Sequence, residues 1–287
     1  MRLVDIAIGL PNTLHIKGPD VVDWARRADE RGFSSLATID RIVYPSYDSL
    51  TVLAVAAGAT SRIRLFPDIL LTPLYPPVWL AKATASLDAL SGGRLTLGLG
   101  VGNRPDDYAA MDRSLERRGK LMDETLDLLH RSWAGDSVTG DEHPVGPEPA
   151  AGGRIPVLVG GTSDAAVRRT VAYGEGWTAG GASPEQVAPM VAKVRRAWQE
   201  AGREGEPRIS ALAYYGLGDE EVSKGSLRRY YSFLGEWADT IANSALRTPN
   251  SIRAAARAFA DVGVTEFVLD PTVPSIDEVD RLADLLL

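Results

Sequence analysis

Predicted strands alternate with predicted amphipathic helices along the whole of this 287-residue chain. The predicted strands are residues 3–8, 34–39, 63–71, 95–101, 155–159, 176–179, 208–215 and 265–270. The predicted helices are residues 20–31, 49–60, 77–90, 106–133 in two pieces, 162 or 163–173, 184–201, 219–242 with a break near Gly235, 251–262 and 276–286. This alternation indicates right-handed β-α-β units and a parallel sheet. Eight units in 287 residues favour one α/β domain, a (β/α)8 TIM barrel over residues 1–287, with an open doubly wound sheet as the alternative.

The composition excludes several classes of function. There is no cysteine, which excludes disulfides, zinc–thiolate sites and thiol nucleophiles, and the three histidines form no metal-binding pattern. The formal net charge is -7 and no run of Lys and Arg exceeds two residues, so we expect no nucleic-acid partner. We also expect no membrane association, since no apolar stretch approaches the length that spans a bilayer. Without a signal-peptide pattern, a cytoplasmic protein is expected, and abundant Arg, Ala and Gly indicate a bacterial source.

Three glycines mark the end of the predicted strand at residues 95–101. Gly98, Gly100 and Gly102 stand at alternate positions, so their missing side chains fall on one face of the chain. Glycine weakens a strand, and this pattern indicates that something approaches that face closely. A flat ligand at the carboxyl end of the strand would explain it, and so would a crowded barrel core. Asn103 follows at once and offers a polar group beside the strand end.

Two glycine pairs precede predicted helices. Gly160 and Gly161 lead into a helix that Thr162 or Ser163 caps, and Gly180-Gly181 repeats the pattern one unit later. Exposed backbone N–H groups at the positive end of a helix suit a phosphate group. Ordinary helix capping by glycine-containing connections explains the same residues equally well.

The loops after the predicted strands contain the candidate acids, bases and substrate contacts. Asp40 ends the second strand, Asp107 follows the fourth, and His15 follows the first, where each could act as a general acid or base. The alternatives are a loop-capping Asp40, an ion pair between Asp40 and Arg41, and a solvated His15. Three further side chains could contact a substrate, namely Arg41, Tyr44 and Tyr75, although aromatic residues at barrel rims also serve as packing.

Three segments together resemble the bacterial luciferase-like superfamily of flavin-dependent oxidoreductases. They are VVDWARRADERGFSSLATID at residues 21–40, the stretch from AAGATSRIRL to LSGGRLTLGLGVG at residues 56–102, and IPVLVGG followed by YGEGW at residues 155–177. The resemblance implies a barrel that holds a flavin or deazaflavin ring at its carboxyl end. It also implies a cis peptide bond at Asp68-Ile69 behind the ring and a phosphate loop at Gly160, Gly161 and Thr162. Asp40 and Asp107 match acidic residues near the reacting face.

Two departures from the deazaflavin members stand out. Arg41 occupies a position where many of them have histidine, and Gly102-Asn-Arg-Pro-Asp-Asp107 replaces their Gly-Glu-x-x-Asn-Glu motif. The chain is also shorter than the two-component FMN monooxygenases of the superfamily and lacks room for their large insertion. This shorter length, set against the resemblance, favours coenzyme F420 over FMN.

These features predict an oxidoreductase that transfers a hydride between F420 or a flavin and an unidentified small organic substrate. One alternative is an FMNH2-dependent monooxygenase that needs a partner flavin reductase. A second is a catalytically silent member that keeps the pocket for a ligand or acts as a scaffold. Residues 134–154 and the loop after Tyr215 are expected to set specificity, and a homodimer is compatible with the family.

Overall fold

The computed structural model describes residues 4–140 and 143–287. The strands are β1 (Asp5–Gly9), β2 (Ser35–Thr38), β3 (Arg64–Pro67), β4 (Leu70–Leu71), β5 (Leu97–Gly100), β6 (Val157–Gly160), β7 (Gly176–Ala179), β8 (Arg208–Tyr215) and β9 (Glu266–Pro271). The helices are α1 (Gly18–Arg31), α2 (Ser49–Ala59), η1 (Thr72–Leu74), α3 (Pro77–Ser91), α4 (Pro105–Ala110), α5 (Arg118–Trp133), α6 (Asp164–Tyr173), α7 (Pro184–Glu200), α8 (Glu220–Tyr230), η2 (Ser232–Leu234), α9 (Trp237–Ser244), α10 (Pro249–Asp261) and α11 (Asp277–Leu286).

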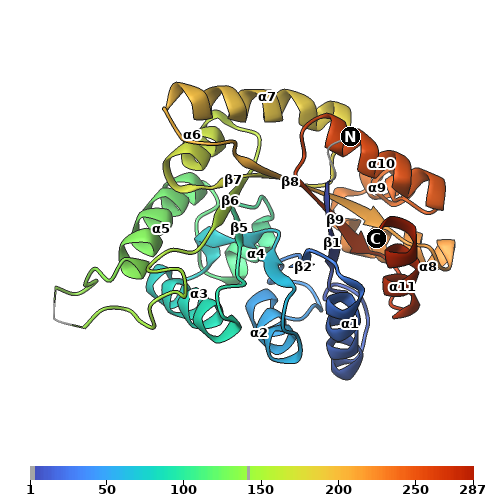
Figure 1. Ribbon diagram of the computed structural model, residues 1–287, viewed down its shortest axis with the longest axis horizontal. Helices are drawn as coiled ribbons and strands as arrows, with labels where there is room; N and C mark the ends of the chain where they lie inside the picture. The colour runs from blue at the N-terminus through green and yellow to red at the C-terminus, as the bar shows by residue number, and fades with distance from the viewer. Residues whose placement is uncertain (1–3, 141–142) are drawn as a thin grey trace.

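The strands form one parallel sheet that curves into a barrel, with helices around it (Figure 1). Their order is β3-β2-β1-β9-β8-β7-β6-β5-β4, and every pair in this order is parallel. A parallel bridge between Leu65 of β3 and Leu95, just before β5, brings the two edges together. The predicted TIM barrel is confirmed and the open sheet is wrong. Leu3, the first residue of the first predicted strand, lies outside the described residues.

The third strand of the barrel differs from its prediction as one continuous strand over residues 63–71. It is interrupted by a cis peptide bond between Asp68 and Ile69, which separates β3 from β4. The Asp68 backbone N–H still donates to the carbonyl of Thr38, at 2.8 Å, whereas the Leu71 N–H donates to the side chain of Asp40, at 2.9 Å. At Leu71 a side-chain hydrogen bond thus replaces the backbone pairing with the second strand. We call Asp68 and Ile69, which lie between β3 and β4, the bulge.

Helix α1 illustrates how the local sequence builds the outer layer. Its buried residues recur at helical spacing, and they are Val21, Trp24, Ala25 and Ala28. The helix ends at Gly32, whose φ of 89° is the left-handed conformation that closes many helices and that glycine adopts without strain. One stripe of the helix therefore packs against the barrel while the opposite face stays in water.

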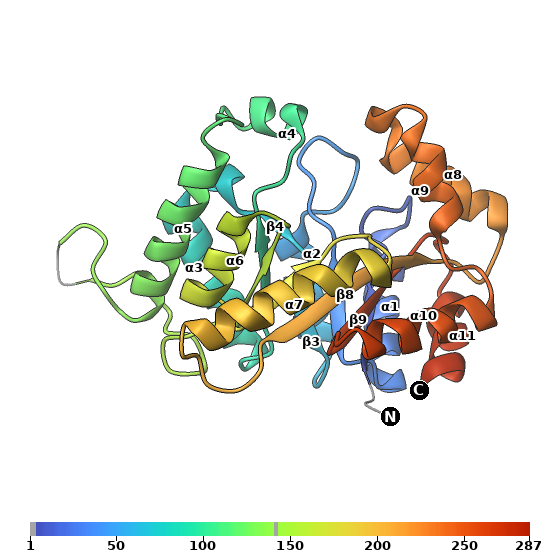
Figure 2. The same cartoon turned by 90° about the horizontal axis from the view of Figure 1, so that it is seen from above.

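Helices α4, α8 and α9 stand beyond the same end of the barrel (Figure 2). The loops that follow the strands, including those after β2 and β5, run to this carboxyl end, where barrel enzymes place their active sites. The expected break near Gly235 is confirmed, since α8, η2 and α9 are separate helices. In the part of the chain that the structure describes, no helix has the length and apolar character needed to cross a membrane.

Candidate active site

A cleft of about 160 Å³ opens at the carboxyl end of the barrel. Its wall combines residues from the ends of several strands and from helix α8, and they include Asp40, Arg41, Asp68, Ile69, Leu71, Gly102, Asn103, Arg104, Gly180, Gly181, Tyr214, Tyr230 and Tyr231. The structure thus brings together eight of the residues expected from the sequence, namely Asp40, Arg41, Asp68, Ile69, Gly102, Asn103, Gly180 and Gly181. Because these residues come from distant parts of the chain, only the closed barrel makes them neighbours.

Asp40 is a buried carboxyl group on this wall, with only 4% of its surface exposed. Its Oδ2 accepts a hydrogen bond from the Leu71 backbone N–H, and the Tyr75 hydroxyl lies 3.0 and 2.9 Å from its two oxygens. Burial raises the pKa of Asp40 to about 6, and these two hydrogen bonds limit the rise because they favour the charged form. Such a carboxyl group can gain or lose a proton near neutral pH.

Asp107 was expected as a second acid or base, but the structure gives it another role. It is fully buried, and its Oδ1 accepts hydrogen bonds from the backbone N–H groups of Ile42 and Val43, at 3.1 and 2.6 Å. Its Oδ2 lies 3.0 Å from Nε of Arg41. Three N–H groups of the loop after β2 thus surround this carboxyl group, and Asp107 does not line the cleft. Asp107 therefore fixes the loop after β2, and its assignment as a catalytic residue is not supported by this geometry.

His15 and Tyr44 are not among the residues that line the cleft. His15 is exposed and borders a separate surface hollow with Glu221 and Arg229. Tyr44 is half-buried and packs edge-on against Tyr230, with the ring centroids 5.0 Å apart. The sequence could place both residues in loops at the correct end of the barrel, but it could not show where those loops turn.

The neighbouring segment at residues 67–71 explains the three alternate glycines. A β-carbon built on Gly98 or Gly100 would clash with the bulge between β3 and β4, at the backbone oxygen of Pro67 or the side chain of Ile69. At Gly102, whose φ is 65°, it would clash with Leu71. The expectation that the cofactor itself borders this strip is therefore corrected for Gly100, because the chain's own bulge fills the space. Ile69 rests on the strip and presents its other side to the cleft.

The loop after β6 leads into helix α6, as the sequence indicates. Ser163 is the N-cap, since its side chain accepts a hydrogen bond from the Ala166 N–H, and this leaves the exposed Thr162 one position outside the cap. Gly161 has a φ of 114°. A β-carbon on Gly160 would lie 3.3 Å from Ile69, so the loop starts beside the floor of the cleft. A phosphate group at the start of α6 could therefore belong to a molecule whose ring lies over Ile69.

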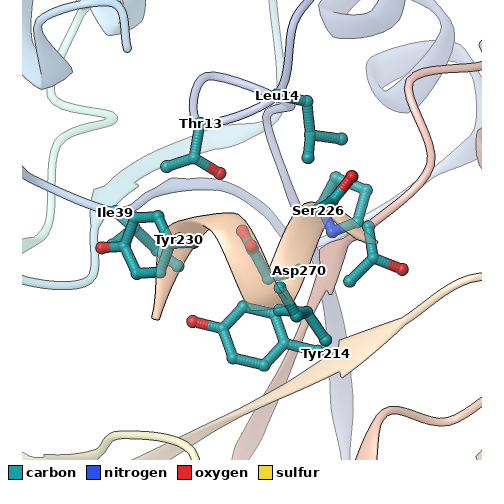
Figure 3. Close-up of a pocket in the computed structure, with 10 residues that line it drawn as sticks. Thr13, Leu14, Ile39, Tyr214, Ser226, Tyr230 and Asp270 are labelled. Atoms are coloured by element: carbon teal, nitrogen blue, oxygen red, sulfur yellow. The ribbon is translucent and has the colours of Figure 1, made fainter. Parts of the chain in front are cut away.

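Two further buried carboxyl groups lie at the carboxyl end of the barrel, Asp68 on the cleft wall and Asp270 in β9. Asp68 accepts a hydrogen bond from the Thr178 hydroxyl at 2.8 Å through Oδ1, and burial raises its pKa to about 7. Asp270 ends β9 and is 2% exposed; burial, together with the charge of Asp68, raises its pKa well above the usual range. Figure 3 shows the Asp270 carboxyl group pointing into a small cavity whose lining includes Thr13 and Tyr230. The sequence places Asp270 among the residues that follow the last predicted strand but assigns it no role, although an aspartate at a strand end was the signal that identified Asp40.

Helix α8 and the residues after it supply aromatic rings that the sequence did not identify. Tyr230 and Tyr231 line the cleft, and the Tyr231 hydroxyl lies 2.6 Å from that of Tyr214, which is in β8. Arg104, at the start of α4, packs against both Tyr230 and Tyr231. These contacts join α4 to α8 across the top of the barrel.

Comparison with known proteins gives consistent results. A model of the luciferase-like monooxygenase family matches residues 8–284. An uncharacterized protein of Mycobacterium tuberculosis is 32% identical over 230 residues, which are 71% of this chain and 80% of that protein. A solved F420-dependent secondary alcohol dehydrogenase, in complex with an F420–acetone adduct, has a TM-score of 0.81 at 17% identity and covers 99% of this chain and 98% of its own.

A second solved structure resembles the chain at a similar level. It is the oxygenating constituent of 3,6-diketocamphane monooxygenase from Pseudomonas putida, in complex with FMN. Its TM-score is 0.71 at 15% identity, and the match covers 100% of this chain and 96% of that one. At such low identity, both solved structures show that the fold is shared.

Proposed function

Because the chain belongs to the luciferase-like monooxygenase family, we propose that it transfers a hydride between coenzyme F420, or alternatively a flavin, and a small organic substrate. The observation that carries this proposal is that Asp40, a buried carboxyl group whose pKa is raised to about 6, lies on the same cleft wall as Ile69. A flat apolar surface and a group that titrates near neutrality are what hydride and proton transfer in one pocket require.

The residues of the cleft fit a flat ring. Ile69 provides an apolar floor, and Gly180 and Gly181 form part of the wall without side chains. A β-carbon on Gly180 would meet no atom within 4 Å, so this wall has open space in front of its backbone. A tricyclic ring could lie on Ile69 with its edge toward these glycines, and its phosphate could reach Gly160, Gly161 and Thr162.

The bound coenzyme would supply or accept the hydride, and the chain's own residues would bind, orient and manage the proton. Asp40 holds a proton below about pH 6 and releases it above, so it can act as acid or base at its carboxyl oxygens. The Leu71 N–H and the Tyr75 hydroxyl hold that carboxyl group in a fixed orientation. Tyr214 and Tyr231, whose pKa values burial raises, stay protonated. Because one of these hydroxyl groups donates to the other, only the accepting one has a hydrogen left to donate to a substrate.

We favour F420 over FMN because the F420-dependent alcohol dehydrogenase has the higher TM-score of the two solved structures, 0.81 against 0.71. Coverage does not separate the two, since both align along nearly the whole of both chains. The alternative, an FMNH2-dependent monooxygenase with a partner reductase, is supported by the FMN complex of the diketocamphane enzyme.

Direct titration tests the proposal. Purified protein is titrated with F420, FMN and riboflavin, and binding is followed by coenzyme fluorescence and calorimetry. Tight F420 binding, with oxidation of reduced F420 by carbonyl compounds in the absence of oxygen, is the expected outcome. Consumption of O2 that depends on FMNH2 would support the monooxygenase instead. Binding of neither coenzyme would favour the silent member of the family.

A further inference from the structure

Arg104 is a buried cation on the wall of the cleft, with only 8% of its surface exposed. Within residues 4–140 and 143–287 it forms no ion pair, and one hydrogen bond, from Nη1 to the Tyr230 carbonyl at 3.5 Å, uses one of its donors. Buried charges in proteins are normally paired, because removing an ion from water is costly. The charge of Arg104 is therefore uncompensated by any carboxylate of the described chain.

Aromatic rings hold the guanidinium group in place. Its central carbon lies 3.7 Å from the ring centroid of Phe233, 4.8 Å from that of Tyr230 and 5.8 Å from that of Tyr231. Such contacts offset part of the cost of burial and restrict the side chain to one orientation. Stacking occupies the faces of a guanidinium group and leaves its N–H donors, which lie in the plane, available for a planar anion.

Arg41 shows the contrasting case on the same wall. Its Nε lies 3.0 Å from Asp107, and its Nη2 donates to Asp106 at 3.2 Å and to the Val43 carbonyl at 2.9 Å. The sequence suggested Arg41 as a substrate contact, but its charge is already paired with two carboxylates of the chain, whereas the charge of Arg104 is not. The structure therefore moves the anion-binding role from Arg41 to Arg104.

We propose that Arg104 is an oxyanion-binding residue that receives a carboxylate or phosphate group of the molecule bound in the cleft. The inference rests on the proposed function, because it assigns part of the same ligand site. An oxyanion beside Arg104 forms two parallel charge-assisted hydrogen bonds and compensates the buried charge. This oxyanion can be a carboxylate of the substrate or the phosphate of the coenzyme, and the following experiment distinguishes the two.

The test uses two pairs of probes that differ in one anionic group. FMN and riboflavin differ in a phosphate, and benzoate and benzamide differ in the charge of one planar group. Dissociation constants for all four are measured by calorimetry with wild-type protein, Arg104→Gln and Arg253→Gln. Arg253 is an exposed residue of α10 and provides the same change in net charge on the outside of the barrel.

Arg104→Gln is expected to lower the affinity for the charged member of one pair about tenfold or more, since charge-assisted hydrogen bonds are lost. The affinity for the neutral member of that pair is expected to stay unchanged. Loss of affinity for FMN assigns the coenzyme phosphate, and loss of affinity for benzoate assigns a substrate carboxylate. Arg253→Gln is expected to behave as wild type. If Arg104→Gln keeps wild-type affinity for all four probes, Arg104 only joins α4 to α8 and the proposal is wrong, whatever happens to the melting temperature.

Arg104→Lys covers the case in which the glutamine variant does not fold. It keeps the charge but cannot form two parallel hydrogen bonds, so several-fold weaker binding of the charged probe is expected and unchanged binding would contradict the proposal. If wild-type protein binds no flavin and no F420, the proposed function fails. The comparison of benzoate with benzamide then tests the role of Arg104 independently of any coenzyme. Equal affinity of wild-type protein for benzoate and benzamide would overturn the inference.

Discussion

The Tyr75 hydroxyl group lies 3.0 Å from Oδ1 and 2.9 Å from Oδ2 of Asp40, so one tyrosine caps both oxygens of this carboxyl group. Tyr75 was expected to contact the substrate. It is instead buried behind Asp40, where its ring stacks on that of Trp79 with the centroids 5.9 Å apart. Tyr75 is therefore a positioning residue that acts through Asp40.

Asp40→Asn tests whether Asp40 transfers the proton. Asparagine keeps the shape of the side chain but cannot exchange a proton, so turnover is expected to fall roughly 10²–10⁴-fold while coenzyme affinity is kept. Single-turnover rates, coenzyme titration and melting temperature are measured on the same variant. A folded Asp40→Asn protein with the wild-type rate would remove Asp40 from the mechanism.

Tyr75→Phe tests the positioning role by its effect on pH dependence. The hydrogen bond from Tyr75 favours the charged form of Asp40, so its loss is expected to raise the pKa of Asp40 above its value of about 6 in the wild-type protein. The limb of the pH–rate profile that reports Asp40 is expected to move to higher pH. A purely structural tyrosine would change the melting temperature and leave this limb in place.

Gly161→Asp tests the phosphate loop. A carboxylate at this position would repel a phosphate group, so affinity for FMN and F420 is expected to fall while affinity for riboflavin changes little. Gly202→Asp is the matched control, because Gly202 also has a positive φ, 67°, and open space around it, but lies in the turn after α7. Equal FMN affinity in both variants would contradict the assignment.

Gly98→Ala tests the packing of the glycine strip. The new methyl group would clash with the Pro67 backbone oxygen, so the bulge must shift, and a loss of roughly 1–3 kcal/mol in the free energy of unfolding is expected. Gly58→Ala makes the same change at an exposed helical site, where a β-carbon would meet no atom within 4 Å. This control is expected to increase the free energy of unfolding by roughly 0.5–1 kcal/mol. Denaturant unfolding of both proteins makes the comparison, and equal stabilities would show that the strip is not tightly packed.

Asp68→Asn tests the burial of a carboxyl group inside the barrel. Burial raises the pKa of Asp68 from an ordinary 3.8 to about 7, so the folded state holds this proton more tightly than the unfolded state does. Its contribution to stability is fully present below about pH 3.8 and is lost as pH rises through about 7, at roughly 1.4 kcal/mol per pKa unit.

Asparagine cannot ionise, so Asp68→Asn is expected to gain stability relative to wild type as pH rises from 4 to 8. Thermal melts across this range measure the difference. Asp106→Asn serves as the control because its side chain is 50% exposed. A difference between Asp68→Asn and wild type that does not change with pH would show that Asp68 has an ordinary pKa.

The sequence by itself determined the barrel and the end at which the site lies. The alternation of strands and helices is a local signal, because each segment's hydrophobic period depends on neighbouring residues only. The same local reading identified the alternate glycines and the break near Gly235. The family resemblance added the cis bond at Asp68-Ile69, which the structure contains.

Only the tertiary structure decided which side chains meet. Ile69 fills the space above Gly100, Asp107 pairs with Arg41, and Arg104 packs against Phe233, more than a hundred residues away. No local pattern encodes these contacts, because they depend on strand register and on the paths of loops that carry no periodicity. Whether a buried charge is paired with a carboxylate, as in Arg41, or has no such partner among the described residues, as in Arg104, follows from those contacts and therefore from the folded barrel alone.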